Sequence, residues 1–315
     1  MEKYTIGIDF GTLSGRCLLV DVASGKEVAA SVYEYPHGVI EGSLPYGRKL
    51  PNDWYLQHPK DYLEVLENTV EKTLDEAGVK PEQVIGIGVD FTACTMLPIT
   101  EDGTPLCMLE KYRSDPNAYV KLWKHHSAQP QADRLTRVAQ ERKENFIKRY
   151  GGKISSEWML PKILQTLEES PDVYRDTYTF LEAGDWIVLQ LTGKLMRNSC
   201  AAGAKCLWHK KSGFPSKEYF KAVHPGLENV VEVICTDFNC RPALLGIRCL
   251  CRLARKKTVC CWRAYLDRAC YLLLLYCGNV DFPGTSAYAD DGRDAPVVLF
   301  LSSTGRTHHI QSLEV

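Results

Sequence analysis

The spacing of apolar residues over the first 80 positions predicts three strands and then one helix. The helix is expected over residues 59–77, where apolar side chains recur at helical spacing and Gly78 is placed to end it. Short turns between successive strands are typical of an antiparallel meander. The three predicted strands are residues 4–10, 16–21 and 26–35.

Further along the chain, strand and helix patterns alternate. Residues 38–53 are rich in Gly and Pro and are expected to form a loop. Residues 84–90 read as a buried strand that ends, like the first strand, in Asp-Phe. This order of elements predicts an α/β fold. Helical patterns are expected over residues 119–129, 131–150, 161–169 and 182–191.

The pattern changes near residue 233. Residues 241–268 contain eight Lys and Arg but one acidic residue, and the apolar segments there have no matching caps or turn signals. A sequence that specifies one structure is consistent across these levels. We therefore predict a well-formed domain over residues 1–232, followed by a divergent, Cys-rich segment over residues 233–315 that does not form a complete domain.

The composition of the chain argues against several classes of protein, among them nucleic-acid-binding, membrane-spanning and disulfide-rich proteins. The chain of 315 residues has 38 Lys+Arg and 39 Asp+Glu, so its net charge of −1 gives no basic surface for nucleic acid or an anionic membrane. No apolar run reaches the length of about 18–20 residues that crosses a bilayer, and no signal peptide is recognised. A cytoplasmic protein is expected. Eight of the 13 Cys lie between residues 235 and 277 without a C-x-x-C pair, so neither a disulfide framework nor a zinc site is expected.

The first candidate site is the turn after the first strand, Asp9-Phe10-Gly11-Thr12-Leu13-Ser14-Gly15-Arg16. Its backbone amides and hydroxyls can face a phosphate group. Asp9 can hold Mg²⁺ directly or through water, because this ion prefers carboxylate oxygens. Arg16 adds a cation for a transferring phosphoryl group. The alternative is an ordinary hairpin turn.

Residues 88–95, Gly-Val-Asp-Phe-Thr-Ala-Cys-Thr, repeat the pattern of the first strand end. Two similar strand ends more than 80 residues apart suggest that both open onto one cleft, whereas the alternative is a buried strand followed by a capped turn. The sequence has no G-x-x-x-x-G-K-[ST] and no G-x-G-x-x-G motif, which disfavours P-loop kinases and Rossmann dehydrogenases.

These motifs resemble the FGGY carbohydrate kinases of the actin/hexokinase/Hsp70 ATPase superfamily, and within them the L-ribulokinases. The resemblance covers residues 1 to about 232. The blocks that carry it are residues 9–16, 88–95, Lys-Leu-Trp-Lys-His-His at 121–126, Ser-Ser-Glu-Trp-Met at 155–159, Pro161-Lys162, Asp-Trp-Ile-Val at 185–188 and Ser-Cys-Ala-Ala-Gly-Ala-Lys at 199–205.

The resemblance implies an RNase H-like, actin-like N-terminal domain that faces a second domain across a cleft for sugar and ATP. It implies transfer of the ATP γ-phosphoryl group to the 5-hydroxyl of L-ribulose in L-arabinose breakdown. Asp9 would then position Mg²⁺, and Gly11, Thr12, Ser14 and Arg16 would form the phosphate-facing turn. By the same resemblance, Ala93 would meet the sugar through its backbone and Lys205 would bond its hydroxyls. The implied partners are L-ribulose and ATP, and a homodimer is left open.

The general base of the family would be Asp281, within Gly278-Asn279-Val280-Asp281. Here Phe282-Pro283 follows in place of Ala-His, so an ordinary loop Asp is the alternative. The family is longer, and its Gly-rich adenosine-binding segment has no counterpart here. Two hypotheses stay open: an L-ribulose kinase completed by residues 233–315, or a truncated or frame-disrupted relative that binds sugar without catalysis.

Other residues in these blocks are expected to be structural. His125 and His126 are predicted on the solvated face of a Lys-rich helix. The side chain of Glu157 is expected to make a structural hydrogen bond, and Cys94 is expected to be buried packing. The tryptophans are expected to anchor the packing rather than to form a sugar platform; they are Trp123, Trp158 and Trp186.

Overall fold

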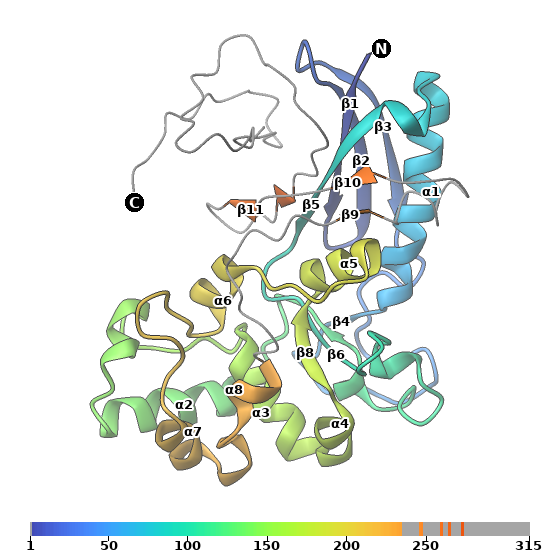
Figure 1. The fold of residues 1–315 in the computed structure, drawn as a ribbon. Helices are drawn as coiled ribbons and strands as arrows, with labels where there is room; N and C mark the ends of the chain where they lie inside the picture. The colour runs from blue at the N-terminus through green and yellow to red at the C-terminus, as the bar shows by residue number, and fades with distance from the viewer. Residues whose placement is uncertain (1, 235–245, 248–258, 261–263, 266–271, 274–315) are drawn as a thin grey trace.

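The computed structural model describes residues 2–234 and four two-residue strands further along the chain (Figure 1). These strands pair antiparallel as β9 with β10 and β11 with β12. Asp281 lies outside the described residues, as does nearly all of the predicted segment 233–315. The four strands are β9 (Gly246–Ile247), β10 (Val259–Cys260), β11 (Ala264–Tyr265) and β12 (Leu272–Leu273).

The first sheet has the strand order β3-β2-β1-β5 and confirms the predicted meander. Its first three strands are antiparallel neighbours, whereas β5 pairs parallel with β1. A parallel neighbour needs a crossover connection, which a helix normally provides. The strands are β1 (Tyr4–Phe10), β2 (Ser14–Asp21), β3 (Glu27–Glu34) and β5 (Val84–Phe91).

The crossover is α1 (Pro59–Ala77), at the predicted position, followed by the short 3-10 helix η1 (Pro81–Gln83). Its boundaries follow from local chemistry, because His58 caps the first turn and Gly78 ends the helix in the left-handed conformation with φ 63°. The helix lies along β2 and β3 (Figure 1) and buries an apolar stripe that includes Tyr62 and Val65.

A second sheet, which the sequence did not predict, has the order β4-β7-β6-β8 and is antiparallel. The helix predicted over 119–129 is wrong, because this segment contains β7 and a turn. The strands are β4 (Leu56–Gln57), β6 (Met96–Ile99), β7 (Val120–Lys121) and β8 (Thr179–Glu182), with 3-10 helices η2 (Leu106–Met108) and η3 (Pro116–Ala118) beside them.

Helices fill the remainder of the described chain. The helix predicted over 131–150 is shorter than expected, because Lys143 takes a left-handed conformation with φ 56° and separates α2 from η4. The predicted helices over 161–169 and 182–191 are confirmed as α3 and α5, within two residues at each end. The elements are α2 (Gln129–Glu141), η4 (Asn145–Tyr150), α3 (Met159–Glu169), α4 (Pro171–Asp176), α5 (Ala183–Thr192), α6 (Ser199–Lys205), α7 (Lys217–Val223), η5 (Pro225–Leu227) and α8 (Val230–Ile234).

The two largest apolar cores belong to different parts of this arrangement. One joins the first sheet to α1 and α5, where Trp186 is buried as predicted. The other lies among α2, α3, α7 and α8. In the part of the chain that the structure describes, no helix is long and apolar enough to cross a membrane.

Candidate functional site

The turn between β1 and β2 is held by hydrogen bonds from segments outside it. Tyr35 donates twice, from its hydroxyl to the Gly11 carbonyl at 3.0 Å and from its amide to the Leu13 carbonyl at 2.9 Å. The Gln57 amide group donates to the Thr12 carbonyl at 2.8 Å. Within the turn, the Gly11 amide bonds the Ser14 carbonyl at 2.9 Å. Two outside residues and one internal hydrogen bond therefore fix the turn that is predicted to face phosphate.

The ends of β1 and β5 lie side by side, as the repeated motif led us to expect. In the parallel pairing Asp9 is the register partner of Asp90, and the Thr92 amide donates to the Phe10 carbonyl at 3.3 Å. The Asp90 carboxylate accepts from the Phe91 amide at 2.8 Å. Two carboxylates thus stand at adjacent strand ends.

Asp9 is the more exposed carboxylate of this pair, and Arg16 is its antiparallel partner on β2. Partial loss of solvent raises the pKa of Asp9, and the Arg16 guanidinium opposes that rise. The exposed Asp9 carboxylate at this strand end offers the hard oxygen ligands that Mg²⁺ prefers. The residues present therefore fit this ion.

Ala93 and Cys94 form the turn that follows β5. Cys94 is 1% exposed and has φ 63°, a conformation that non-glycine residues rarely take. Burial raises the pKa of the Cys94 thiol to about 12, so it is packing rather than a nucleophile, as predicted. The hydroxyls of Thr92 and Thr95 bond each other across the turn at 2.9 Å.

Lys205, the last residue of α6, stands near this turn and is partly exposed. It acts electrostatically on the Cys94 thiol together with Lys162, Glu157 and Glu182. The structure therefore brings Lys205 to the same region as Ala93, although the two lie more than 100 residues apart. The three other charged groups were not assigned to the site from the sequence.

Trp123 differs from its prediction as a packing anchor, because it is 39% exposed. Its indole Nε1 donates to the Thr12 hydroxyl at 3.2 Å. This contact connects the segment after β7 to the phosphate-facing turn. No pattern in the sequence indicated it, because the two residues are 111 positions apart.

The prediction for His125 is wrong: the residue is buried and does not lie on a helix. Its Nε2 is paired with Gln165 Oε1 at 2.9 Å, and its Nδ1 accepts from the Tyr55 amide at 3.4 Å. Burial holds its pKa well below the usual range, so the ring is neutral. His126 is exposed as predicted but is not on a helix, and it pairs with the Ser156 hydroxyl at 3.2 Å.

Lys121 on β7 is also buried and shares the partner Gln165 with His125; we call these buried polar residues the polar layer around β7. Its Nζ donates to Asn117 Oδ1 at 2.7 Å, to Gln165 Oε1 at 2.9 Å and to the Thr166 hydroxyl at 3.0 Å. Burial lowers the pKa of Lys121, because the ammonium group has lost its water shell.

We expect wild-type stability to rise relative to that of a Lys121→Met variant as the pH increases from 7.5 to 8.5, by up to about 1 kcal/mol. Burial lowers the pKa of Lys121 from 10.5 to about 7 in the folded chain, so between pH 7.5 and 8.5 the unfolded chain binds more protons than the folded one. Urea unfolding at both pH values measures the difference in the free energy of unfolding. A difference that stays constant, or moves in the opposite direction, contradicts the prediction.

His37, His58 and Asp61 also form a group with metal-ligand chemistry in the described part of the chain. Their hydrogen bonds serve the start of α1 instead. His37 Nδ1 is paired with Asp61 Oδ1 at 2.5 Å, and His58 Nδ1 accepts from the Lys60 amide at 3.2 Å. The two imidazole rings are stacked with centroids 4.5 Å apart.

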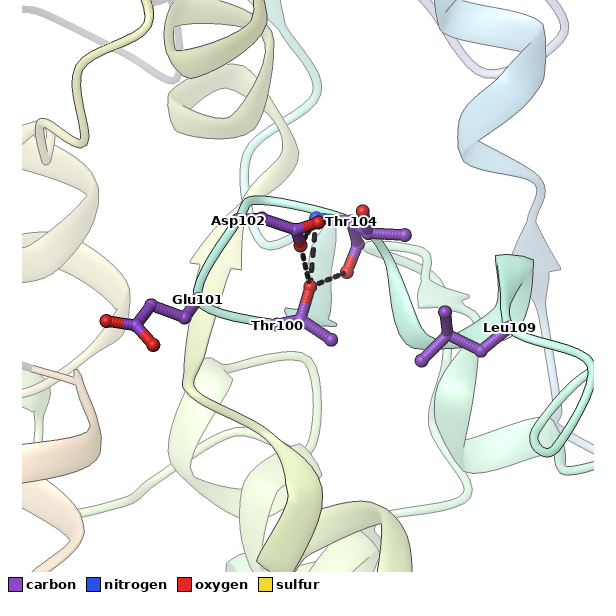
Figure 2. Close-up of a pocket in the computed structure, with 5 residues that line it drawn as sticks. All are labelled: Thr100, Glu101, Asp102, Thr104 and Leu109. Carbon is purple, nitrogen blue, oxygen red and sulfur yellow. Dashed lines mark hydrogen bonds between the residues drawn. The ribbon is translucent and has the colours of Figure 1, made fainter.

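A hollow of about 500 Å³ lies elsewhere, over the turn after β6 (Figure 2). Its polar groups satisfy one another, since Thr100 and Thr104 exchange hydrogen bonds at 3.1 Å and the Asp102 carboxylate accepts from both residues. None of the predicted site residues lines it, so we do not assign a function to it.

Comparison with known proteins places the chain in a family. The N-terminal domain model of the FGGY family of carbohydrate kinases matches residues 4–221. The chain is 55% identical over 226 residues to a ribulokinase of Bacillus licheniformis and 56% identical over 229 residues to one of Halalkalibacterium halodurans. These matches cover 71% and 72% of this chain but 41% of each relative. The chain thus spans about two fifths of the length of these ribulokinases.

A solved structure of a ligand-bound xylulose kinase from Lactobacillus acidophilus resembles the chain with a TM-score of 0.52, at 16% identity, over 70% of this chain and 40% of that one. A Brucella ovis xylulose kinase gives a TM-score of 0.51 at 17% identity, over 70% of this chain and 41% of that one. These structures support the α/β fold, and the family match confirms the resemblance drawn from the motifs. The chain belongs to the FGGY family of carbohydrate kinases and carries the N-terminal domain of that family.

Proposed function

We propose that this chain carries the sugar-facing and phosphate-facing part of a kinase that transfers the γ-phosphoryl group of ATP to L-ribulose, giving L-ribulose 5-phosphate. The observation that carries the proposal is the identity of 55–56% to ribulokinases across the stretch that contains the phosphate-facing turn and Ala93. Both substrates are small soluble metabolites, and the cytoplasm is the proposed location.

Each site residue has a proposed role. Asp9 holds Mg²⁺, directly or through water, and the ion supplies charge neutralisation on the ATP phosphates. Thr12 and Ser14 present their hydroxyls to these phosphates. Gly11, whose amide is bonded to the Ser14 carbonyl, shapes the turn. Arg16 stabilises charge that develops on the transferred group. Phosphoryl transfer needs mainly such positioning and neutralisation. The hydrogen bonds that fix the turn support this assignment.

On the sugar side, Ala93 meets L-ribulose through its backbone and Lys205 bonds sugar hydroxyls. Their shared position near Cys94 supports the pairing. Asp281 is the proposed general base for the 5-hydroxyl, a role that needs hydrogen-bond reach to that oxygen. It lies outside the described residues.

A second candidate function is sugar binding without catalysis. The observation in its favour is that the family match ends at residue 221 and that the relatives are more than twice the length of the matched stretch. In this case the chain would bind L-ribulose but would not turn it over.

The test is L-ribulose-dependent ADP release by the purified chain with Mg-ATP, measured beside the effect of L-ribulose on thermal unfolding. Turnover supports the kinase, whereas a ribulose-dependent rise in Tm without turnover supports the sugar-binding protein. If neither signal appears, both functions are excluded for this chain.

A further inference from the structure

Lys162 on α3 contacts the turn that contains Ala93 and Cys94. The side chain is fully buried, with 0% exposure. Its Nζ donates to the carbonyl of Cys94 at 2.6 Å, to that of Leu122 at 2.9 Å and, more weakly, to that of Lys121 at 3.5 Å. Three backbone dipoles therefore replace the water shell of the ammonium group.

Two of these carbonyls come from turns, and the third, that of Lys121, from the end of β7. Cys94 lies in the turn after β5, next to Ala93, and Leu122 lies in the turn after β7, next to Trp123. The two turns are about 28 positions apart along the chain, and Lys162 is 40 or more from each. One ammonium group thus forms hydrogen bonds with both turns.

The backbone conformation of Cys94 indicates that the hydrogen bond from Lys162 has a specific structural role. A cysteine with φ 63° is strained relative to the ordinary regions of backbone space, and such residues persist only where their surroundings hold them. The 2.6 Å hydrogen bond fixes the Cys94 carbonyl and hence the orientation of the peptide groups beside it. Burying an ammonium group is costly, and an apolar side chain of similar length would fill the same volume without that cost.

We propose that Lys162 is a positioning residue: it holds the Ala93–Cys94 turn in the left-handed conformation that presents the Ala93 backbone to L-ribulose. The role of L-ribulose as the ligand rests on the proposed function. The effect of Lys162 on the conformation of the turn applies also to the ligand-free chain. Lys162 is buried and acts through the turn, without touching the sugar.

The experiment compares Lys162→Met with Lys121→Met in the full chain. Lys121 is the control, because it is an equally buried ammonium that donates to Asn117, Gln165, Thr166 and, at 3.1 Å, the Lys162 carbonyl, whereas the hydrogen bond to the Cys94 carbonyl comes from Lys162. We expect Lys162→Met to raise the Kd for L-ribulose at least tenfold, while Lys121→Met changes it less than threefold. Deuterium exchange in the ligand-free chain should become faster in the 92–95 segment of Lys162→Met and stay as in wild type in Lys121→Met.

A rescue variant separates positioning from general stability. Glycine adopts φ near 60° without strain, so adding Cys94→Gly to Lys162→Met should recover at least part of the lost affinity. If Lys162→Met does not fold, Lys162→Arg takes its place, since a planar guanidinium keeps the charge but cannot direct three donors in the same way.

The outcomes distinguish the two proposals. If wild type does not bind L-ribulose, the proposed function fails, and the exchange of the 92–95 segment alone decides whether Lys162 holds the turn. If wild type binds and the folded Lys162 variant binds equally well, the positioning role is overturned. Equal loss in the Lys121 and Lys162 variants, or no recovery with Cys94→Gly, also overturns it.

Discussion

Replacing Gly15 by alanine is expected to destabilise the domain by about 2–3 kcal/mol, in the upper range for an overpacked core. A β-carbon at this position would lie 2.4 Å from Cγ1 and 2.6 Å from Cγ2 of Val65. Val65 is fully buried on α1, and its branched side chain has few rotamers with which to move away. To relieve this overlap, α1 would have to move away from the start of β2, next to the turn between β1 and β2.

Two further variants test this cause by urea unfolding. In the double variant Gly15→Ala/Val65→Ala, the two closest atoms are gone, so the combined loss should be smaller than the sum of the single losses. Gly7→Ala on β1 is the control, because its β-carbon would have nothing within 4 Å, and we expect a change below about 0.5 kcal/mol. An additive double variant, or an equal loss from Gly7→Ala, would show that the contact with Val65 is not the cause.

The elements predictable from the sequence are those whose signals are local. The meander has short turns between its strands, and α1 combines helical spacing with Pro59 at its start and Gly78 at its end. Their positions agree with prediction within two residues at each end. The turn between β1 and β2 could also be located from the sequence, because its glycines and hydroxyls occur in one continuous stretch; its role toward phosphate stays a prediction.

The polar layer around β7 could not be predicted, because the local spacing of its residues in the sequence indicates a solvated helix. Lys121 and His125 are four positions apart, as polar residues on one face of a solvated helix would be. Both are buried instead, because Gln165 on α3 supplies a partner for each from about 40 positions away. A single sequence contains no indication of this pairing. The second sheet was missed for a different reason: its strands are only two to four residues long, which is too short for a clear alternation of apolar and polar residues.

The same limit applies to the candidate site. Sequence motifs indicated the residues that we propose to face the ligands, Asp9, Ala93 and Lys205 among them. The groups that hold these segments in place come from remote parts of the chain, and Gln57 and Trp123 reach the same turn residue, Thr12, from positions 45 and 111 residues away. Supporting residues of this kind become visible only in the folded structure.

For the proposed kinase activity, Asp9→Asn is expected to reduce L-ribulose-dependent ADP release about 100-fold or more, the scale seen when one preorganised electrostatic group is removed from an active site. The change keeps the shape of the side chain but removes the charge that would hold Mg²⁺ at the end of β1. Stability should stay within about 0.5 kcal/mol of wild type, because Asp9 is exposed and its raised pKa shows that the fold does not favour the charged form. Both quantities are measured on the same preparation.

Asp90→Asn is the matched control, since Asp90 is the register partner of Asp9 on the neighbouring strand. Its carboxylate accepts a hydrogen bond from the Phe91 amide, and an asparagine oxygen can accept the same bond. We therefore expect a much smaller loss of activity than for Asp9→Asn, and a rise in Tm with Mg-ATP that Asp9→Asn does not show. Equal losses in the two variants would contradict a specific role for Asp9, because they would mean that any loss of negative charge at these strand ends has the same effect.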